Sequence, residues 1–184
     1  LKAAAATNQP FLQAFRGILL AAEICVAVLS FTLLGLVESH AIFACYPLLV
    51  AALSGPILGE KVGWRRWAAI GTGFIGILII LEPGVTVFAI EALIPLASAL
   101  MFAVYGLLTR YVSRQDSAAT SFFWTGITGA IFMTAVGIWF WEAMAPTDWI
   151  WMGFLCMTGA LGHYLLIRAY EVAEASAVQP FAYL

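Results

Sequence analysis

Two ionisable side chains, Glu23 and His163, lie inside long apolar stretches of this sequence. An acid or an imidazole in such a stretch is costly unless it is paired, neutral or in contact with water, so both are candidates for proton transfer or ligand binding. Histidine also changes charge near neutral pH, which suits it to carrying or sensing a proton. A structural interpretation stays open for each: a protonated or water-contacting glutamate, and a histidine that hydrogen-bonds a neighbouring helix.

Aromatic residues and prolines accompany these two residues in the apolar stretches. Tyr105 and Trp124 are expected near the middle of their stretches, and Tyr105 and Tyr164 are candidates for the wall of a substrate cavity, with packing in the core as the alternative. Pro47 and Pro180 each remove a backbone hydrogen bond, which is tolerated where a helix lines a cavity. We interpret these prolines as kinks that shape a central cavity.

The apolar stretches themselves predict the fold class. The chain is 64% hydrophobic and 10% charged, whereas soluble domains carry about a quarter charged residues. Because about 20 apolar residues cross a bilayer and lipid leaves no backbone group unsatisfied, each long stretch predicts a helix. The expected fold is an all-α, polytopic transmembrane helix bundle with six complete spans and the start of a seventh. After a lead-in at 1–14, the spans are 15–36, 41–59, 67–81, 92–109, 118–141 and 149–170, and the seventh begins at 177–184.

Several other classes of function lack their sequence signals. No basic stripe is present for nucleic acid, and the three cysteines lie in apolar stretches without metal-ligand spacing, so we expect no metal and no cofactor. The G-x-G-x-x-G pattern at 71–76 lies within an apolar helix and follows no strand, which indicates close helix packing and excludes a dinucleotide site.

The charged residues predict the orientation. All Lys and Arg residues fall at the lead-in, at the second and fourth loops or at the end of the sixth span, which alternate spans place on one side of the membrane. They are Lys2, Arg16, Lys61, Arg65, Arg66, Arg110, Arg114 and Arg168. The positive-inside rule makes this side cytoplasmic, in a cell (inner) membrane.

Glu60, Arg65 and Arg66 belong to the second of these loops. We expect them to form an interfacial cluster that fixes the topology, and Arg168 to mark the end of its span. Glu60 can also lie near the N-terminus of the next helix, where the helix dipole favours negative charge. A role in gating is the alternative for this cluster. Because Arg16 marks the boundary of the first span, Glu23 is expected about 10 Å inside the bilayer, in the cytoplasmic third.

A weak internal repeat relates the first and sixth spans. A shift of 133 positions places Glu38 on Glu171, Ala44 on Ala177 and Pro47 on Pro180. An odd number of helices separates the two copies, so they would have opposite orientations. Inverted repeats of this kind are typical of secondary transporters.

Three segments carry a resemblance to a known family. The segments LLGLVESHAIFACYPLL, GPILGEKVGWRRWAAIGTGFIGILIILEPG and GALGHYLLIRAYEVAEASAVQPFAYL resemble EamA-type proteins of the drug/metabolite transporter superfamily. The resemblance implies a ten-helix fold of two inverted five-helix repeats, in which the six spans are the third to the eighth. Residues 1–84 would then belong to the first repeat and 85–184 to the second, as a fragment that lacks both ends. Glu23 and the pair Ser39-His40 depart from the family pattern.

The functional hypothesis that follows is transport. We expect a secondary transporter, an exporter or permease, that moves a small organic metabolite or drug-like solute by alternating access through the lipid bilayer. A proton, cation or solute gradient would supply the energy, with Glu23 and His163 as coupling or binding residues. A membrane-embedded enzyme or a non-transporting membrane subunit is the alternative, but enzymes concentrate catalytic groups at one place, and the ionisable residues here are scattered. The substrate and the oligomeric state stay open.

Overall fold

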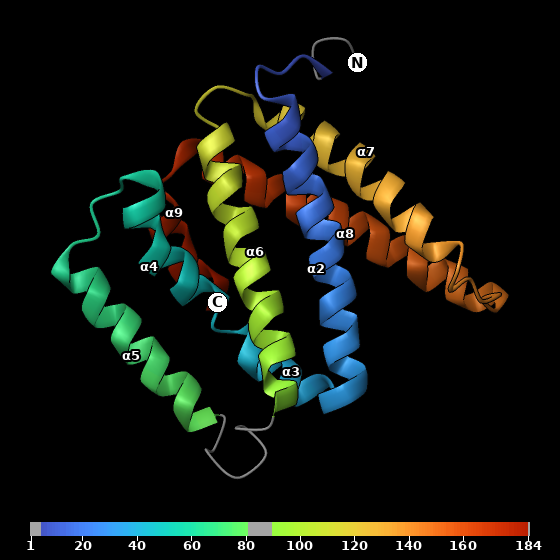
Figure 1. Cartoon of the computed structure of the whole chain (residues 1–184), viewed down its shortest axis with the longest axis horizontal. Helices are drawn as coiled ribbons and strands as arrows, with labels where there is room; N and C mark the ends of the chain where they lie inside the picture. Colours follow the sequence, from blue (N-terminus) through green and yellow to red (C-terminus); the bar gives the residue numbers. More distant parts are fainter. Residues whose placement is uncertain (1–4, 81–89, 184) are drawn as a thin grey trace.

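A computed structural model describes residues 5–80 and 90–183 as a set of helices (Figure 1). Every regular element in these two ranges is helical, which confirms the all-α class. The elements are α2 (Pro10–Leu34), α3 (Leu36–Phe43), α4 (Tyr46–Leu58), α5 (Trp64–Ile80), η1 (Ile90–Ala92), α6 (Leu93–Val112), α7 (Ala118–Gly137), α8 (Pro146–Val172), α9 (Ala175–Val178) and η2 (Gln179–Tyr183).

Five helical segments are long and apolar enough to cross a membrane. They are α2, the α3–α4 pair, α6, α7 and α8. The 17-residue helix α5 is shorter, with its apolar part at Trp67–Gly76, and the predicted helix end at 81–84 lies outside the described residues. The protein is an integral membrane protein, and the described residues supply five of the six expected spans at full length.

The helix α6 is central to the bundle. It packs against α2, α3, α4 and α8, while α7 packs on the other side of α2 (Figure 1). Ala99, Ala103 and Tyr105 on α6 have no exposed surface. A Cβ atom at Gly106 would lie 2.8 Å from the Tyr170 hydroxyl of α8. The small side chains of α6 therefore allow its neighbours to approach closely, as in other membrane bundles.

The first helix begins earlier than expected. The lead-in was predicted to extend to residue 14, but α2 starts at Pro10. Proline is favoured in the first turn of a helix, where its missing N–H group needs no partner. As a consequence Arg16 lies inside the helix and not at its boundary.

The second expected helix is divided in two, and the polar turn predicted at residues 37–40 is helical. The chain breaks at Gly35, whose φ of 90° is favourable for glycine alone, and α3 then runs through 37–40 to Phe43. A second break at Ala44 and Cys45 precedes α4. A proline ring clashes with the carbonyl four residues earlier in a continuous helix, so Pro47 stands in the first turn of a new helix.

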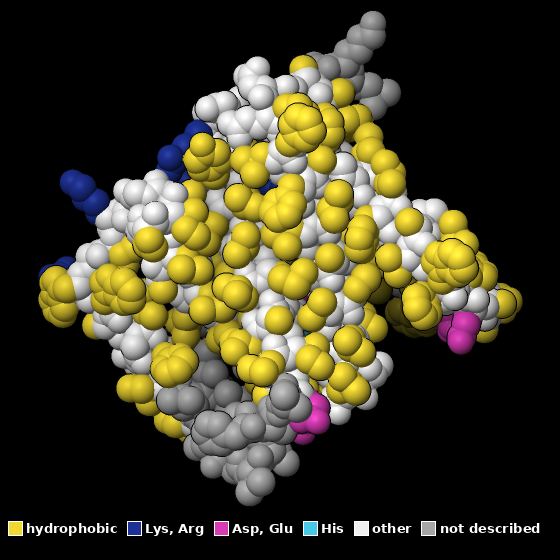
Figure 2. Space-filling model, viewed as in Figure 1, with side chains coloured by type: hydrophobic (Ala, Val, Ile, Leu, Met, Phe, Trp, Pro, Cys, Tyr) yellow, Lys and Arg dark blue, Asp and Glu magenta, His cyan; other side chains and the backbone are white. Residues whose placement is uncertain are grey.

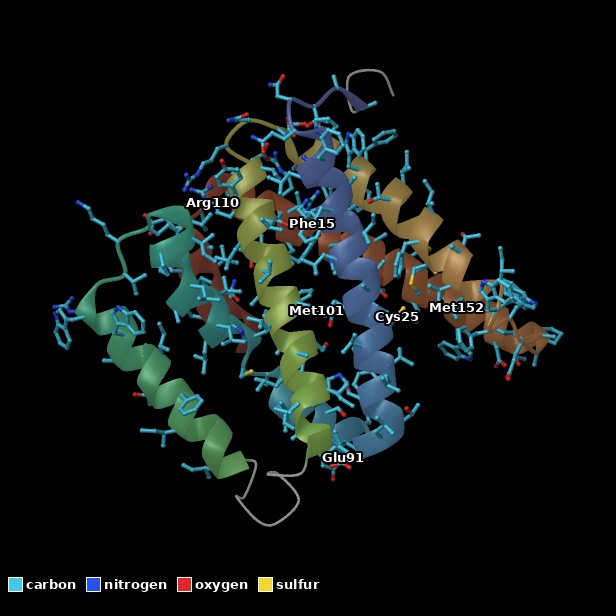
Figure 3. The ribbon with its side chains drawn as sticks, viewed as in Figure 1. Phe15, Cys25, Glu91, Met101, Arg110 and Met152 are labelled. Atoms are coloured by element: carbon cyan, nitrogen blue, oxygen red, sulfur yellow. The ribbon has the colours of Figure 1, made fainter. Side chains whose placement is uncertain are left out.

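The surface is apolar between two charged ends. In Figure 2 hydrophobic side chains cover most of the visible face, Lys and Arg gather at its upper left, and Asp and Glu appear at its lower and right ends. Along α6, Arg110 and Glu91 mark opposite ends (Figure 3). Exposed Phe, Ile, Leu and Trp side chains on α5, α7 and α8 fit an environment of lipid. We call the end that holds Arg110 the basic end.

Candidate functional site

A group of polar side chains is buried between α2, α6 and α8, and we call Arg16, Tyr105 and His163 the interior polar cluster. Arg16 and Tyr105 have no exposed surface, and His163 is partly buried. Counted from the basic ends of their helices, the three residues lie about 9 to 14 Å inside the bundle at 1.5 Å per residue. The preceding residue, Phe15, is 54% exposed on the outer face of α2 (Figure 3), because successive helical residues point about 100° apart.

The guanidinium of Arg16 is held by neutral groups. Its Nη1 donates to Thr109 Oγ1 at 3.0 Å, and its Nη2 donates to Gln13 Oε1 at 2.7 Å and to the Ser121 carbonyl at 2.6 Å. Arg16 interacts with Asp116 only through the Gln13 amide, whose Nε2 donates to Asp116 Oδ2 at 2.8 Å. A buried charge is costly unless it is paired. The Arg16 guanidinium makes hydrogen bonds to neutral groups, but it forms no direct ion pair with a carboxylate of the described residues.

Each residue of the interior polar cluster keeps one polar atom without a hydrogen-bond partner among the described residues. These atoms are Arg16 Nε, the Tyr105 hydroxyl and His163 Nδ1. The guanidinium carbon of Arg16 lies 5.4 Å from the centre of the Tyr105 ring, and the rings of Tyr105 and His163 meet edge to face at 6.1 Å. Buried polar groups are nearly always paired in native proteins, so these three atoms on neighbouring residues make the cluster a candidate site.

Glu23 forms a second buried polar contact between α2 and α6. It is 4% exposed and accepts a hydrogen bond from Ser98 Oγ at 2.6 Å. The expected distance of about 10 Å was counted from Arg16 as the boundary of the span, but the helix starts earlier. Since α2 begins at Pro10, Glu23 lies near its midpoint, about 20 Å from the helix start.

Two predicted aromatic site residues lie away from the interior polar cluster. Trp124 was expected near mid-membrane, but its Nε1 donates to the Ala5 carbonyl at 3.2 Å, beside the N-terminal segment at the basic end. Tyr164 is 38% exposed and packs edge to face on Phe122 of α7. Of the three predicted aromatics, Tyr105 alone joins the cluster.

The two prolines of the sequence repeat line one cavity. Pro47 of α4 and Pro180 of η2 line a half-open cavity of about 220 Å³, and α5 forms a further part of its wall. Gln179, 3% exposed, also lines it. Pro47 shapes this cavity as the first-turn residue of α4, after the chain break, and not as a kink in a continuous helix.

A connected set of charged side chains joins the helix ends at the basic end, and we call Glu60, Arg110, Arg114 and Glu171 the basic-end network. Glu60 accepts hydrogen bonds from the backbone N–H groups of Ala175 at 2.9 Å and Ser176 at 3.2 Å. Its carboxylate also lies 3.6 Å from Arg110 Nε. Glu60 was expected near the N-terminus of the next helix, but α5 begins only four residues later, at Trp64. Glu60 instead caps α9, a helix that is distant in the sequence.

The arginines of the basic-end network bind backbone carbonyls. Arg110 Nη1 donates to the Tyr170 carbonyl at 2.8 Å, and Arg114 Nη2 donates to the Leu58 carbonyl at 2.7 Å. Glu171 accepts from the Ala118 N–H at 3.2 Å, at the start of α7. The network thereby holds the ends of α4, α6, α7, α8 and α9 together.

The other predicted interfacial residues lie on the surface. Arg65 stacks over its neighbour Trp64, with 5.8 Å from guanidinium carbon to ring centre. Arg168 pairs with Glu171 and is 51% exposed. The Arg66 side chain lies outside the described part of the chain.

Sequence analysis did not single out Arg16, Gln13 or Gln179. Arg16 was assigned to a helix boundary, and that assignment removed it from the list of membrane-buried charges. The Pro10 signal for a helix start, with Gln13 and Arg16 one turn apart on the same helix, could have placed it inside. Gln179 has no comparable signal, since its burial depends on packing against Tyr170.

No metal site accompanies these groups in residues 5–80 and 90–183. Among them, no three His, Cys, Asp or Glu side chains come close enough to hold an ion. The structure thus gathers a guanidinium, a phenol and an imidazole inside an otherwise apolar bundle, and it places a carboxyl group, Glu23, about 10 Å further along α2.

Known proteins similar to this chain are bacterial transporters. The chain is 35% identical over 145 residues to a riboflavin transporter of Vibrio cholerae, and the aligned region covers 78% of the chain and 49% of that protein. It is 25% identical over 183 residues to an S-adenosylmethionine uptake transporter of Rickettsia prowazekii, covering 100% of the chain and 62% of that protein. A riboflavin transporter of Rhizobium johnstonii is 30% identical over 186 residues, and the aligned region covers 97% of the chain and 60% of that protein.

The chain thus spans between 49% and 62% of the length of these relatives. No protein-family model matches the chain, and no solved structure matches it significantly. The names of these relatives indicate a family of transporters.

Proposed function

We propose that the protein is a secondary transporter of a small organic metabolite. The observation that carries this proposal is the interior polar cluster, in which three unpartnered polar atoms from α2, α6 and α8 converge inside an apolar bundle. Polar groups placed within a membrane bundle at such cost usually mark the pathway of a solute or an ion. The similarity to transporters supports the same function over an enzymatic one.

The relatives suggest the class of solute. Two of them are named for riboflavin and one for S-adenosylmethionine, both of which combine a ring system with polar groups. We propose a metabolite of this kind as the substrate, with riboflavin and S-adenosylmethionine as the first solutes to test.

The proposed architecture is that of EamA-type members of the drug/metabolite transporter superfamily. In this proposal the chain contributes the third to the eighth helix of a ten-helix, inverted-repeat protein in the bacterial inner membrane, with the basic end in the cytoplasm. The boundary between the repeats, at residues 84 and 85, lies outside the described residues. The meeting of Pro47 and Pro180 at one cavity supports the pairing of the two copies.

Alternating access needs one closed end in each state. In the structure the basic-end network joins five helix ends, so we propose that this conformation is closed toward the cytoplasm. Opening would separate Glu60 from α9 and would expose the interior polar cluster to cytoplasmic water. A solute or ion gradient would drive the cycle, with Glu23 and His163 as the groups that couple it.

Uptake into proteoliposomes tests the proposal. The purified protein is reconstituted and assayed with labelled riboflavin, S-adenosylmethionine and a panel of metabolites, with and without a proton gradient. We expect saturable uptake of at least one solute above protein-free liposomes. Folded, correctly inserted protein that moves none of them would contradict transport.

Substitution of Glu23 tests the coupling role. Glu23→Gln keeps an acceptor for Ser98 Oγ, so the fold is expected to persist. Gradient-driven uptake is expected to fall by about tenfold or more, because an amide can neither bind nor release the coupling proton. The matched control is Glu142→Gln, an exposed acid outside the helices. Unchanged gradient-driven uptake by Glu23→Gln would remove this residue from the mechanism.

A further inference from the structure

The cavity between α4, α5 and η2 contains an unmet hydrogen-bond acceptor. Gln179 is 3% exposed and lines this cavity. Its Nε2 donates to the Tyr170 hydroxyl at 2.7 Å. Its Oε1 is buried and has no partner among the described residues. A buried carbonyl that lacks a donor is costly, so the cavity is built for a molecule that supplies one.

The remaining wall selects for an apolar, uncharged body. The cavity is lined by Pro47, Ala51, Ile70 and Pro180, among other residues, and no charged side chain from the described residues lines it. One further polar residue, Ser176, also lines it, and its hydroxyl donates to Glu60 Oε2 at 3.1 Å. The two prolines have no N–H group, so near Pro47 and Pro180 the wall presents ring surfaces without backbone donors. A charged ligand would lose its hydration here without gaining a partner.

The cavity is also narrow. Helix α5 approaches α4 so closely that a Cβ atom at Gly73 would lie 2.9 Å from the Leu48 side chain. With a volume of about 220 Å³, the space is smaller than the sites of whole drug-sized ligands, which span about 300–1,000 Å³. It is suited to one flat ring system and not to a complete large metabolite.

We infer that this cavity binds a flat, largely apolar and uncharged ring that carries one N–H or O–H donor, with Gln179 Oε1 as the acceptor that recognises it. The inference rests on the proposed function for the claim that this ring belongs to the transported solute. Tyr170 acts as a positioning residue, since it holds the Gln179 amide from the other side.

A pair of ring probes isolates the donor. Indole has one N–H group, whereas benzofuran has nearly the same shape with an ether oxygen in its place. Saturation-transfer NMR on the protein in lipid nanodiscs measures the binding of both, with empty nanodiscs to subtract partition into lipid. We expect indole to bind about tenfold more tightly than benzofuran, the effect of one buried hydrogen bond.

Three variants complete the binding test. Gln179→Leu keeps a similar volume and is expected to bring indole down to the affinity of benzofuran. Gln115→Leu makes the same change at an exposed position of the basic end and is expected to match wild type. Ala69→Leu, on the α5 wall, is expected to fill the cavity and to abolish the specific binding of both probes.

Three outcomes would overturn the inference. Equal binding of indole and benzofuran to wild type would show that water, and not the ring's N–H group, donates to Gln179 Oε1. A preference for indole that persists in Gln179→Leu would place the recognition elsewhere. Binding no stronger in wild type than in Ala69→Leu would show that a lipid chain or the protein itself fills the cavity.

Uptake separates this inference from the proposed function. In proteoliposomes, Gln179→Leu is expected to raise the KM of a transported ring-bearing solute by about tenfold, with an unchanged amount of inserted protein. If uptake proceeds with unchanged KM, the ring does not belong to the transported solute and the inference fails while transport stands. If no solute is moved but the preference for indole holds, transport fails and the cavity site stands.

Discussion

The basic-end network and the interior polar cluster are both built from charged and polar side chains, but they differ in how these side chains are satisfied. Glu60 accepts hydrogen bonds from two backbone N–H groups and from the Ser176 hydroxyl, and it faces Arg110. In the interior polar cluster, Arg16, Tyr105 and His163 each keep an atom without a partner. In the basic-end network Arg110 Nε likewise has no hydrogen-bond partner among the described residues, but it lies 3.6 Å from the Glu60 carboxylate. The first region therefore pairs its charges across helix ends, whereas the unpartnered atoms of the second face no described carboxylate.

This difference separates structural charges from functional ones. Removing a satisfied group should cost stability, because its former partners are then left buried and unpaired. Removing an unsatisfied group should cost little stability and should act on binding or transport instead. Variants of the two regions test this distinction directly.

The largest effect is expected at Glu60. Glu60→Ala leaves two N–H groups of α9 and the Arg110 side chain without their acceptor, so the free energy of unfolding is expected to fall by about 3 kcal/mol, as for other broken buried ion pairs. Unfolding in detergent, followed by circular dichroism, measures this loss. Glu142→Ala, at an exposed acid, is the control. A change equal to that of the control would mean that the basic-end network does not stabilise the fold.

An opposite pattern is expected at His163. His163→Phe retains a flat ring against Phe102 and Tyr105, and His163 Nδ1 has no hydrogen-bond partner among the described residues. The free energy of unfolding should therefore change by less than about 1 kcal/mol. Uptake should nevertheless fall by about tenfold if the imidazole contacts the solute or its coupling ion.

The comparison for His163 is Phe102→Leu. This variant alters the same ring contacts without touching a polar group, so it reports the effect of packing alone on uptake. Wild-type uptake by His163→Phe, or a loss of stability as large as that of Glu60→Ala, would show that the imidazole is structural.

The smallest effect is expected at Arg168. Its pair with Glu171 joins two residues of one helix, and the Arg168 side chain is 51% exposed, so Arg168→Gln should change the free energy of unfolding by less than about 0.5 kcal/mol. Arg110→Gln provides the contrast, since Arg110 is 20% exposed and binds the Tyr170 carbonyl. Its loss should cost about 2 kcal/mol. Equal unfolding curves for these two variants would remove the distinction between surface and network arginines.

Much of the fold could be predicted from local properties of the chain. Long apolar stretches correctly indicated a membrane protein made of helices, and the predicted starts and ends of α6, α7 and α8 fall within a few residues of the observed ones. The errors arose at prolines and glycines. Pro10 starts a helix inside the expected lead-in, and Gly35 together with Pro47 divides the chain into more pieces than hydropathy suggests, because hydropathy does not register backbone geometry.

The candidate site was predicted only in part. Tyr105 and His163 were expected from their positions in apolar stretches, and the structure brings them together. Their neighbour Arg16 was not expected, since its assignment depended on a helix boundary that was placed five residues too late. Trp124 and Tyr164 satisfied the same sequence criteria as Tyr105, but the rotation of their helices directs them elsewhere.

The sequence by itself determined the class of the protein and most of its helical elements, because hydropathy acts within one helix. Tertiary structure decided which polar groups share an environment. The backbone partners of Glu60 lie 115 and 116 residues away. Gln179 Oε1 has no partner among the described residues because of how α4, α5 and α8 pack around it. Hydrogen-bond satisfaction depends on the positions of both partners, and those positions are fixed only when the helices pack.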